Sequence, residues 1–195
     1  MTFWIFSILG LTAGLLFIKM AYVIAVACTI GTTQGALFVS TSRARIHAVL
    51  DELRLSGDQV LIDLGCGDGR ALRAAQKRFG VRTIGYEINP LAYAKAKLYC
   101  AGRGHEIRCR DFRHEAVNTA DVIFCYLFPD VLAGLVEKIK SEAKPGAIVV
   151  SFNFPLPELT PVKILRPRGW RQNDPIYFYR MSEAATGEIP IVPGW

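Results

Sequence analysis

Short apolar runs alternate with helical segments between residues 60 and 152, and this alternation limits the possible folds more than any other feature of the sequence. Four strands are expected at Val60–Leu64, Val81–Tyr86, Val122–Leu127 and Ala147–Phe152, of which the first is a short apolar run and the third is strongly apolar. Such runs are typical of strands that are buried on both faces of a parallel sheet. A weaker strand is expected at Glu106–Cys109. Strands that alternate with helices predict a doubly wound, mostly parallel α/β sheet.

Helices are expected between and before these strands. They are a segment capped by Ser42, followed by Arg70–Phe79, Pro90–Ala101 and Asp130–Ala143. In the first of them, apolar residues recur at the spacing of one helix face. These residues are Ile46, Val49, Leu50 and Leu53. In the third, a proline occupies the first turn, which is a common position for proline at the start of a helix.

The pattern changes after Phe154, where four prolines occur by Pro167. Two extended stretches, Val162–Leu165 and Ile176–Met181, then flank a region rich in turn-forming residues. This arrangement predicts a C-terminal β-hairpin. The hairpin would bring the sheet to seven strands. We expect the domain to cover residues 41–182, with residues 183–195 as a C-terminal tail.

The segment before the domain is strongly apolar. Phe3–Ile30 contains 28 residues, and its only charge is Lys19. As a helix it would be about 42 Å long, and the hydrocarbon core of a bilayer is about 30 Å thick. We therefore expect residues 1–40 to be a membrane anchor with a transmembrane helix over about residues 3–30. Because Lys19 could extend to the membrane interface, the sequence leaves open one or two embedded segments.

Charge and cysteine content limit the partners that the chain can have. Arg43 and Arg45 follow the apolar segment, so the positive-inside tendency predicts that the domain lies on the cytoplasmic side of the membrane or its equivalent. The net charge of +6 suits contact with anionic membrane lipid. No basic run is interleaved with aromatic residues, and we therefore expect no nucleic-acid binding. The five cysteines form no C-x-x-C pair, so we expect reduced thiols and no metal site.

A glycine-rich loop, Asp63–Gly69, follows the first strand. Glycines at positions 65, 67 and 69 allow a tight turn and a close approach of the backbone to a ligand. In open α/β sheets, ligands bind at the carboxyl ends of the strands beside such a loop. The acid two residues before the first glycine would repel a pyrophosphate. It suits the ammonium and sulfonium groups of S-adenosylmethionine.

Acidic residues also follow the second and third strands. Glu87 ends the second strand, where a carboxylate can accept hydrogen bonds from both hydroxyls of a ribose. Asp111 and Phe112 follow the third strand, where an acid can bind the adenine amino group and a ring can cover the base. Three acids at successive strand ends predict one cofactor site. The residues expected to form it are Asp63, Gly65, Cys66, Gly67, Gly69, Glu87, Asp111 and Phe112.

These motifs resemble those of the class I methyltransferases, which have a Rossmann-like sheet and use S-adenosylmethionine. Two further segments, Tyr126–Pro129 and Ser151–Pro157, resemble a narrower group of protein-lysine methyltransferases. That group includes an archaeal enzyme of broad specificity and mitochondrial enzymes that act on the ATP synthase c-subunit and the adenine nucleotide translocase. The sequence departs from the group at Glu158–Leu159, where a tryptophan is usual. This departure lies on the expected substrate side.

The resemblance implies that the methyl acceptor is a lysine ε-amine of a protein at or near the membrane. A lysine must be neutral to attack a methyl group, and an aromatic, desolvating channel favours the neutral form. We expect Tyr126, Phe128 and Phe154 to line this channel, with Tyr126 and Asn153 as the catalytic residues. Two alternatives remain: a class I methyltransferase that acts on a membrane-confined quinone or lipid, and a non-catalytic, membrane-tethered module that binds S-adenosylmethionine.

Overall fold

A computed structural model of the chain describes residues 2–32, 41–102, 104–166 and 174–182. The chain divides into two compact units, Met1–Leu37 and Phe38–Trp195. The first unit contains helix α1, Thr2–Thr32, in which the side chains of residues 6–21, 23 and 24 are described. The predicted linker up to residue 40 and the predicted tail from residue 183 lie outside the described residues.

Large apolar side chains on α1 are exposed to solvent. They are Phe6, Ile8, Leu9, Leu11, Leu15, Leu16, Phe17, Ile18, Met20, Val23 and Ile24. Within the part of the chain that the structure describes, no helix combines the length and the apolar character that are needed to cross a membrane. The transmembrane helix that the sequence predicts over residues 3–30 is therefore not found.

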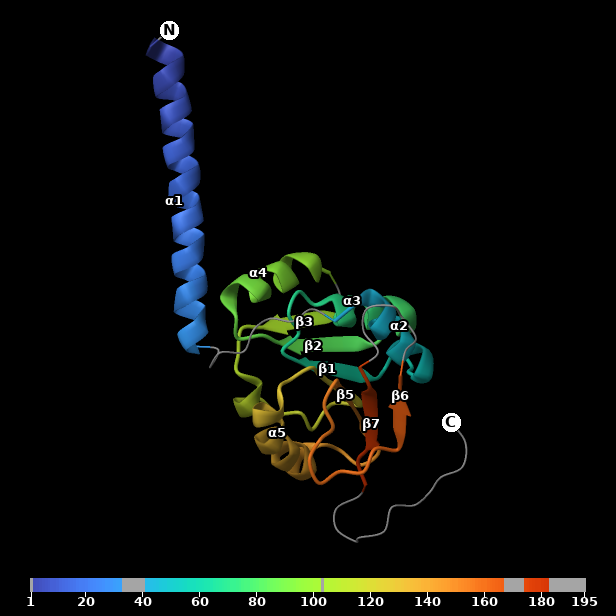
Figure 1. Cartoon of the computed structure of the whole chain (residues 1–195). Coiled ribbons are helices and arrows are strands. Elements are labelled where there is room, and N and C mark those ends of the chain that lie inside the picture. The colour runs from blue at the N-terminus through green and yellow to red at the C-terminus, as the bar shows by residue number, and fades with distance from the viewer. Residues whose placement is uncertain (1, 33–40, 103, 167–173, 183–195) are drawn as a thin grey trace. The chain divides into compact units, whose positions relative to one another are not determined.

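The second unit is built on a seven-stranded sheet with the strand order β3-β2-β1-β4-β5-β7-β6 (Figure 1). The strands are β1 (Val60–Leu64), β2 (Arg82–Tyr86), β3 (His105–Arg108), β4 (Val122–Cys125), β5 (Ile148–Phe152), β6 (Lys163–Leu165) and β7 (Ile176–Arg180). Chain order reverses between β1 and β4, so the carboxyl ends of these two central strands flank the switch point at which ligands bind in open α/β sheets.

The sheet is mixed, which corrects the prediction of a mostly parallel one. Strands β1 to β5 pair in parallel, but β7 pairs antiparallel with both β5 and β6. The predicted antiparallel pairing of the last two strands is confirmed. The hairpin is part of the main sheet. Its second strand, β7, lies between β5 and β6 and is antiparallel to both. A parallel return would need a longer crossover, usually a helix.

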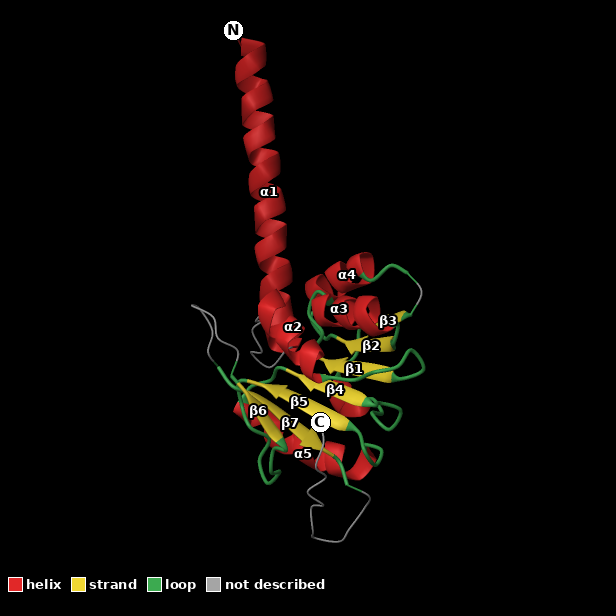
Figure 2. Cartoon of the chain, turned by 90° about the vertical axis from the view of Figure 1, so that its right-hand side faces the viewer, coloured by secondary structure: helices red, strands yellow, loops and turns green. Residues whose placement is uncertain are grey.

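Helices cover both faces of the sheet (Figure 2). They are α2 (Arg43–Glu52), α3 (Arg70–Phe79), α4 (Pro90–Tyr99) and α5 (Pro129–Glu142), with a short 3-10 helix, η1 (Phe112–His114). Apolar residues of α2, α3 and α4 form one buried core with one face of the sheet. Apolar residues of α5 form a second core with the opposite face. The predicted cap of α2 is confirmed, because the Ser42 side chain accepts a hydrogen bond from the Arg45 backbone N–H at 3.4 Å.

Successive side chains on a strand point to opposite faces of the sheet, so residue parity determines which side chains face α2 and α3. Leu61 and Phe124 belong to the core beneath these helices, and side chains two residues apart on a strand share a face. The same parity places Asp63 and Tyr126 on this side, together with Phe152 of β5. The chain therefore gathers its polar strand-end residues on the face that α2 and α3 cover.

Candidate active site

The glycine-rich loop adopts the conformation that its glycines permit. Gly65, Gly67 and Gly69 all have positive φ angles, of 83°, 58° and 72°, which other residues rarely adopt. The backbone N–H groups of Gly65 and Cys66 both donate to the Tyr86 carbonyl at 2.9 Å. The loop is thereby tied to the end of β2, where Glu87 follows.

Glu87 holds this loop through both of its carboxylate oxygens. Oε2 accepts from the Gly67 backbone N–H at 2.8 Å, and Oε1 accepts from the Asn89 backbone N–H at 2.8 Å. The residue is buried. Burial raises the pKa of Glu87, while the backbone N–H groups act in the opposite direction. The two carboxylate oxygens offer about four acceptor positions, so the group can also accept from a ribose hydroxyl.

Asp63 is a buried carboxyl group at the end of β1. Burial raises its pKa to about 7, and the nearby carboxylates of Glu87 and Asp68 add to this effect. Of these three acids, Asp68 alone forms an ion pair within the described part of the chain. The loop therefore carries an excess of negative charge. Such a site favours a ligand with positive groups, as S-adenosylmethionine has, and disfavours a pyrophosphate.

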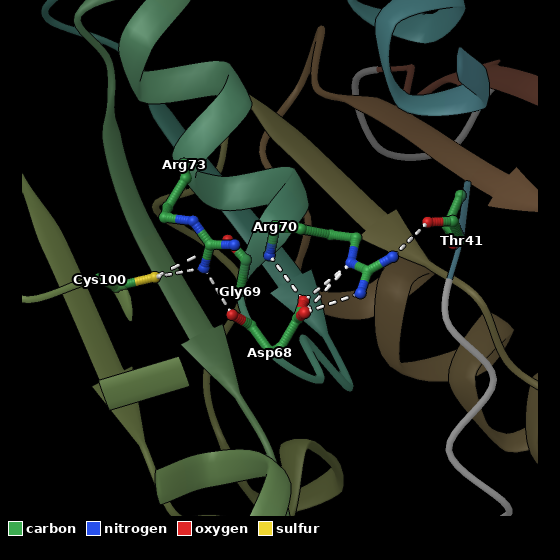
Figure 3. Close-up of polar contacts among 6 residues, drawn as sticks. All are labelled: Thr41, Asp68, Gly69, Arg70, Arg73 and Cys100. Atoms are coloured by element: carbon green, nitrogen blue, oxygen red, sulfur yellow. Dashed lines mark hydrogen bonds and ion pairs between the residues drawn. The ribbon is translucent and has the colours of Figure 1, made fainter. Parts of the chain in front are cut away.

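Arg70 connects the glycine loop to the segment that leads into α2 (Figure 3). Its guanidinium forms an ion pair with Asp68 at 2.8 Å, and its Nη1 donates to the Thr41 carbonyl at 3.3 Å. Arg73, one helical turn further along α3, donates to the Asp68 carbonyl at 2.6 Å. These contacts hold the loop in addition to those of Glu87. Neither arginine is predicted from the sequence, although both lie in the first turn after the glycines.

Asp111 occupies the end of β3, as expected, but its carboxylate is engaged locally. It caps η1 by accepting from the Arg113 backbone N–H at 3.0 Å, and it forms an ion pair with the Arg113 guanidinium at 2.6 Å. This arginine lowers the pKa of Asp111. Phe112 is half-buried beside the core that α5 covers. Contact of Asp111 and Phe112 with adenine stays a prediction.

The two segments expected on the acceptor side come together. The Asn153 side-chain amide donates from Nδ2 to the Tyr126 hydroxyl at 2.9 Å, and the rings of Phe128 and Phe154 lie 6.3 Å apart. Asn153 has a φ of 70°, a left-handed conformation that asparagine tolerates better than most residues. The buried Asn153 Oδ1 has no hydrogen-bond partner among the described residues. A free hydrogen-bond acceptor, the Asn153 side-chain oxygen, is therefore available at the end of β5.

Two residues that the sequence analysis missed also shape this face. Arg45 of α2 is buried, and its guanidinium carbon lies 5.6 Å from the centre of the Phe152 ring. Its position four residues before the buried Val49 places it on the core-facing side of the helix. The four-residue spacing between Arg45 and Val49 is the sequence pattern that could have predicted the burial of this arginine. Gly85 of β2 was missed because the requirement for a glycine there comes from distant packing partners: an added Cβ would lie 2.6 Å from Leu72 Cδ1 and 2.7 Å from Cys66 Sγ.

The geometry agrees with comparisons to known proteins. The ANTKMT methyltransferase domain family matches residues 63–163, from the end of β1 to the first residue of β6. The chain belongs to this family. The expectation of a class I methyltransferase of the Rossmann-like type is thereby confirmed, and the protein is an enzyme of the methyltransferase class.

Similar proteins include an archaeal and an animal relative. A protein-lysine N-methyltransferase of Saccharolobus islandicus (strain REY15A) is 30% identical over 152 residues, which cover 75% of this chain and 94% of that protein. The adenine nucleotide translocase lysine N-methyltransferase of Mus musculus is 33% identical over 133 residues, which cover 66% of this chain and 57% of that protein. The chain thus spans nearly the whole archaeal relative but little more than half of the animal one.

A solved structure shares the fold over most of the chain. An RNA methyltransferase from Salinibacter ruber in complex with S-adenosyl-L-homocysteine superposes with a TM-score of 0.70 at 27% identity, covering 77% of this chain and 98% of that chain. A methyltransferase from Geobacter sulfurreducens, also in complex with S-adenosyl-L-homocysteine, superposes with a TM-score of 0.53 at 22% identity. The second likeness concerns the fold alone.

Proposed function

We propose that this ANTKMT-type enzyme transfers methyl groups to lysine ε-amines of a protein. The observation that carries the proposal is the match to the archaeal protein-lysine N-methyltransferase, which extends over 94% of that relative. The animal relatives are also named as lysine N-methyltransferases. The site geometry supports the same chemistry, because aromatic rings and an unpaired amide oxygen meet at the ends of β4 and β5.

The cofactor is S-adenosylmethionine, which supplies an electrophilic methyl group on a sulfonium. We propose that the backbone of the glycine loop approaches it closely, that Glu87 accepts from its ribose hydroxyls, and that Asp63 lies near its positive groups. The excess of carboxylates at this loop fits those groups. The positive φ angles of the glycines leave the approach free of side chains.

The remaining task of the chain is to align and desolvate the acceptor. In the methyl transfer, the amine lone pair forms the new N–C bond while the S–C bond breaks and its electron pair stays on sulfur. The methylated nitrogen then loses a proton to solvent. Tyr126 and Phe152 present apolar ring surface, which disfavours a charged ammonium. Asn153 Oδ1 can accept one amine N–H and so direct the lone pair.

We further propose that the enzyme acts at a membrane. The exposed apolar side chains of α1 support this proposal, since a large apolar surface of this kind marks a contact with lipid or with protein. The net charge of +6 adds attraction to anionic lipid. A protein acceptor in the same membrane would meet the site at a high effective concentration.

A transfer experiment tests the acceptor class. The full-length protein is incubated with tritiated S-adenosylmethionine and a membrane fraction, and labelled products are identified by mass spectrometry. We expect a methylated lysine, with less label when the Glu87→Ala variant is used at limiting cofactor. Label confined to a lipid or a quinone would replace the lysine proposal with a small-molecule acceptor, and label in RNA would replace it with a nucleic acid. Cofactor binding without any transfer would indicate a non-catalytic module.

A further inference from the structure

Unpaired polar atoms gather at one place in the described part of the chain. Among the described residues, the buried side-chain nitrogen and oxygen atoms without a hydrogen-bond partner are Nε and Nη1 of Arg45 and Oδ1 of Asn153. These residues come from α2 and from the segment after β5, and both are neighbours of Tyr126. Buried polar groups are almost always paired in folded proteins. Their convergence beside the acceptor segments therefore points to a ligand at this position.

The buried guanidinium of Arg45 carries a positive charge that a nearby carboxylate neutralises only weakly. Arg45 is 2% exposed, and a guanidinium stays protonated in proteins. The charged or titratable side chains that act on it within the described residues are Tyr126 and Asp174. Its Nη1 lies 4.0 Å from Asp174 Oδ2, and the Asp174 side chain is 52% exposed and so partly screened by water. Its Nη2 donates to the Asp174 carbonyl at 3.2 Å.

We propose that Arg45 is a further residue of the acceptor subsite, and that its buried charge keeps the incoming lysine amine in the neutral, nucleophilic form. The inference rests on the proposed function. A cation at a desolvated site disfavours a second cation beside it, and lysines are activated in this way next to another cationic group. The Phe152 ring beneath the guanidinium holds this charge in place.

Arg45 and Asn153 then divide the recognition of the amine between them. The Asn153 Oδ1 can accept an N–H from an amine in either charge state, so it orients the acceptor. Arg45 can only donate, so it offers nothing to the N–H groups and instead opposes the ammonium form. The Tyr126 hydroxyl accepts from Asn153 Nδ2, which leaves Oδ1 as the free acceptor of this amide.

The pH dependence of kcat tests the proposal, since kcat reports ionisations in the enzyme–substrate complex. The full-length enzyme is saturated with S-adenosylmethionine and with the protein substrate found in the transfer experiment. Rates are measured from about pH 6.5 to about pH 9.5, below the pKa of about 10.4 of an unperturbed lysine. For the wild type we expect kcat to rise and reach a plateau within this range. A rate that still rises at the upper limit would overturn the proposal.

Substitutions separate charge from packing. Arg45→Met keeps an unbranched apolar stem and removes the charged guanidinium. The midpoint of the kcat–pH curve should therefore move up by about one pH unit, which is about a tenfold loss of kcat below the midpoint. Arg45→Lys should keep the midpoint near that of the wild type. Arg78→Met, at an exposed arginine paired with Asp51, is the matched control and should not move it. A lower rate at every pH with an unchanged midpoint in Arg45→Met would assign Arg45 a structural role only.

A second substitution keeps the test decisive if Arg45→Met does not fold. Asp174→Asn removes the nearby carboxylate from a half-exposed position, so the midpoint should fall slightly, by a few tenths of a pH unit at about the scale of exposed pairs. A midpoint that rises would contradict the proposal. If the wild-type enzyme methylates no lysine, the proposed function fails. If it methylates lysine but the midpoints do not respond, the inference about Arg45 fails alone.

Discussion

At the scale of single residues, the charge on Asp63 makes cofactor binding depend on pH. Its pKa is raised to about 7 by burial and by two neighbouring carboxylates, so below that pH the unliganded domain holds it largely neutral. A cationic ligand favours the ionised form. Affinity for S-adenosylmethionine should therefore increase as the pH rises to about 7 and level off above it, and binding near pH 6 should release a proton. Calorimetry in two buffers of different ionisation enthalpy measures that proton.

The raised pKa of Asp63 also determines how the free energy of unfolding changes with pH. An acid whose folded-state pKa lies above its unfolded value of 3.8 binds more protons when folded, so its contribution to stability falls as the pH rises from about 4 through about 7. Asp63→Asn should remove both the proton release and this part of the pH dependence, and it should bind the cofactor more weakly at pH 8. Proton release that persists in Asp63→Asn would assign the effect to another group.

Glu87 should contribute to binding through its position between the loop and the ribose. Glu87→Ala removes the partner of two backbone N–H groups and the expected partner of two hydroxyls. A hydrogen bond to a charged group contributes about 1.5–3 kcal/mol, so the Kd should rise by about 10-fold to 150-fold. Glu137→Ala, at an exposed acid on α5, is the control and should leave the Kd unchanged. Equal affinities of wild type and Glu87→Ala would remove Glu87 from the site.

At the residue scale, the sequence predicted the glycine turn and the strand-end acid beside it, and the roles of these residues toward the cofactor stay predictions. Glycines permit the positive φ angles of a tight turn, and the carboxyl ends of neighbouring parallel strands lie at the same edge of the sheet, where Glu87 contacts the loop. Arg45 and Gly85 could not be identified in the same way. Their roles depend on side chains far along the chain, on Phe152 and Asp174 for the arginine and on Leu72 for the glycine.

At the scale of elements, local periodicity predicted the helices and the parallel strands. The order of the last three strands depends instead on long-range strand pairing. The predicted Val60–Leu64 and Arg70–Phe79 match β1 and α3, because an apolar run and a glycine at each end of the helix delimit them. The order of the last three strands was not predictable from spacing. It depends on Ile176 pairing with both Phe152 and Leu165, which is a long-range choice.

The packing of β2 against α3 gives a prediction at this scale. Gly85→Ala places a Cβ against Leu72 Cδ1 and Cys66 Sγ, both of which belong to buried residues. Overpacking of this kind costs about 1–3 kcal/mol. Because Cys66 belongs to the glycine loop, cofactor affinity should fall as well. Chemical denaturation and calorimetry measure the two effects.

Gly134 provides the matched control for this substitution. It lies on α5, and an added Cβ would meet nothing within 4 Å. Gly134→Ala should therefore stabilise the helix by about 0.5–1 kcal/mol and leave cofactor affinity unchanged. If Gly85→Ala behaved like Gly134→Ala, the close packing of β2 and α3 would not constrain the loop.

At the scale of the whole molecule, the chain combines an acidic cofactor site with a basic overall charge. The net charge of +6 belongs to the complete chain, whereas the glycine loop brings Asp63, Asp68 and Glu87 together. The domain can therefore attract a cation-bearing cofactor at short range while the rest of its surface favours anionic partners. The basic surface need not offset the acidic site, because solvent-exposed charges are largely screened beyond about 8 Å in physiological salt.

The division of the chain into two compact units gives the last prediction. A truncated chain that starts at Thr41 retains the glycine loop, all three strand-end acids and the Thr41 carbonyl that Arg70 contacts. It should fold and bind S-adenosylmethionine with the affinity of the full chain. Methylation of a membrane protein should fall about tenfold or more if α1 raises the effective concentration of enzyme at the membrane. A folded truncation without cofactor binding would mean that the first unit completes the site, and an unchanged rate on membranes would mean that α1 does not act as a tether.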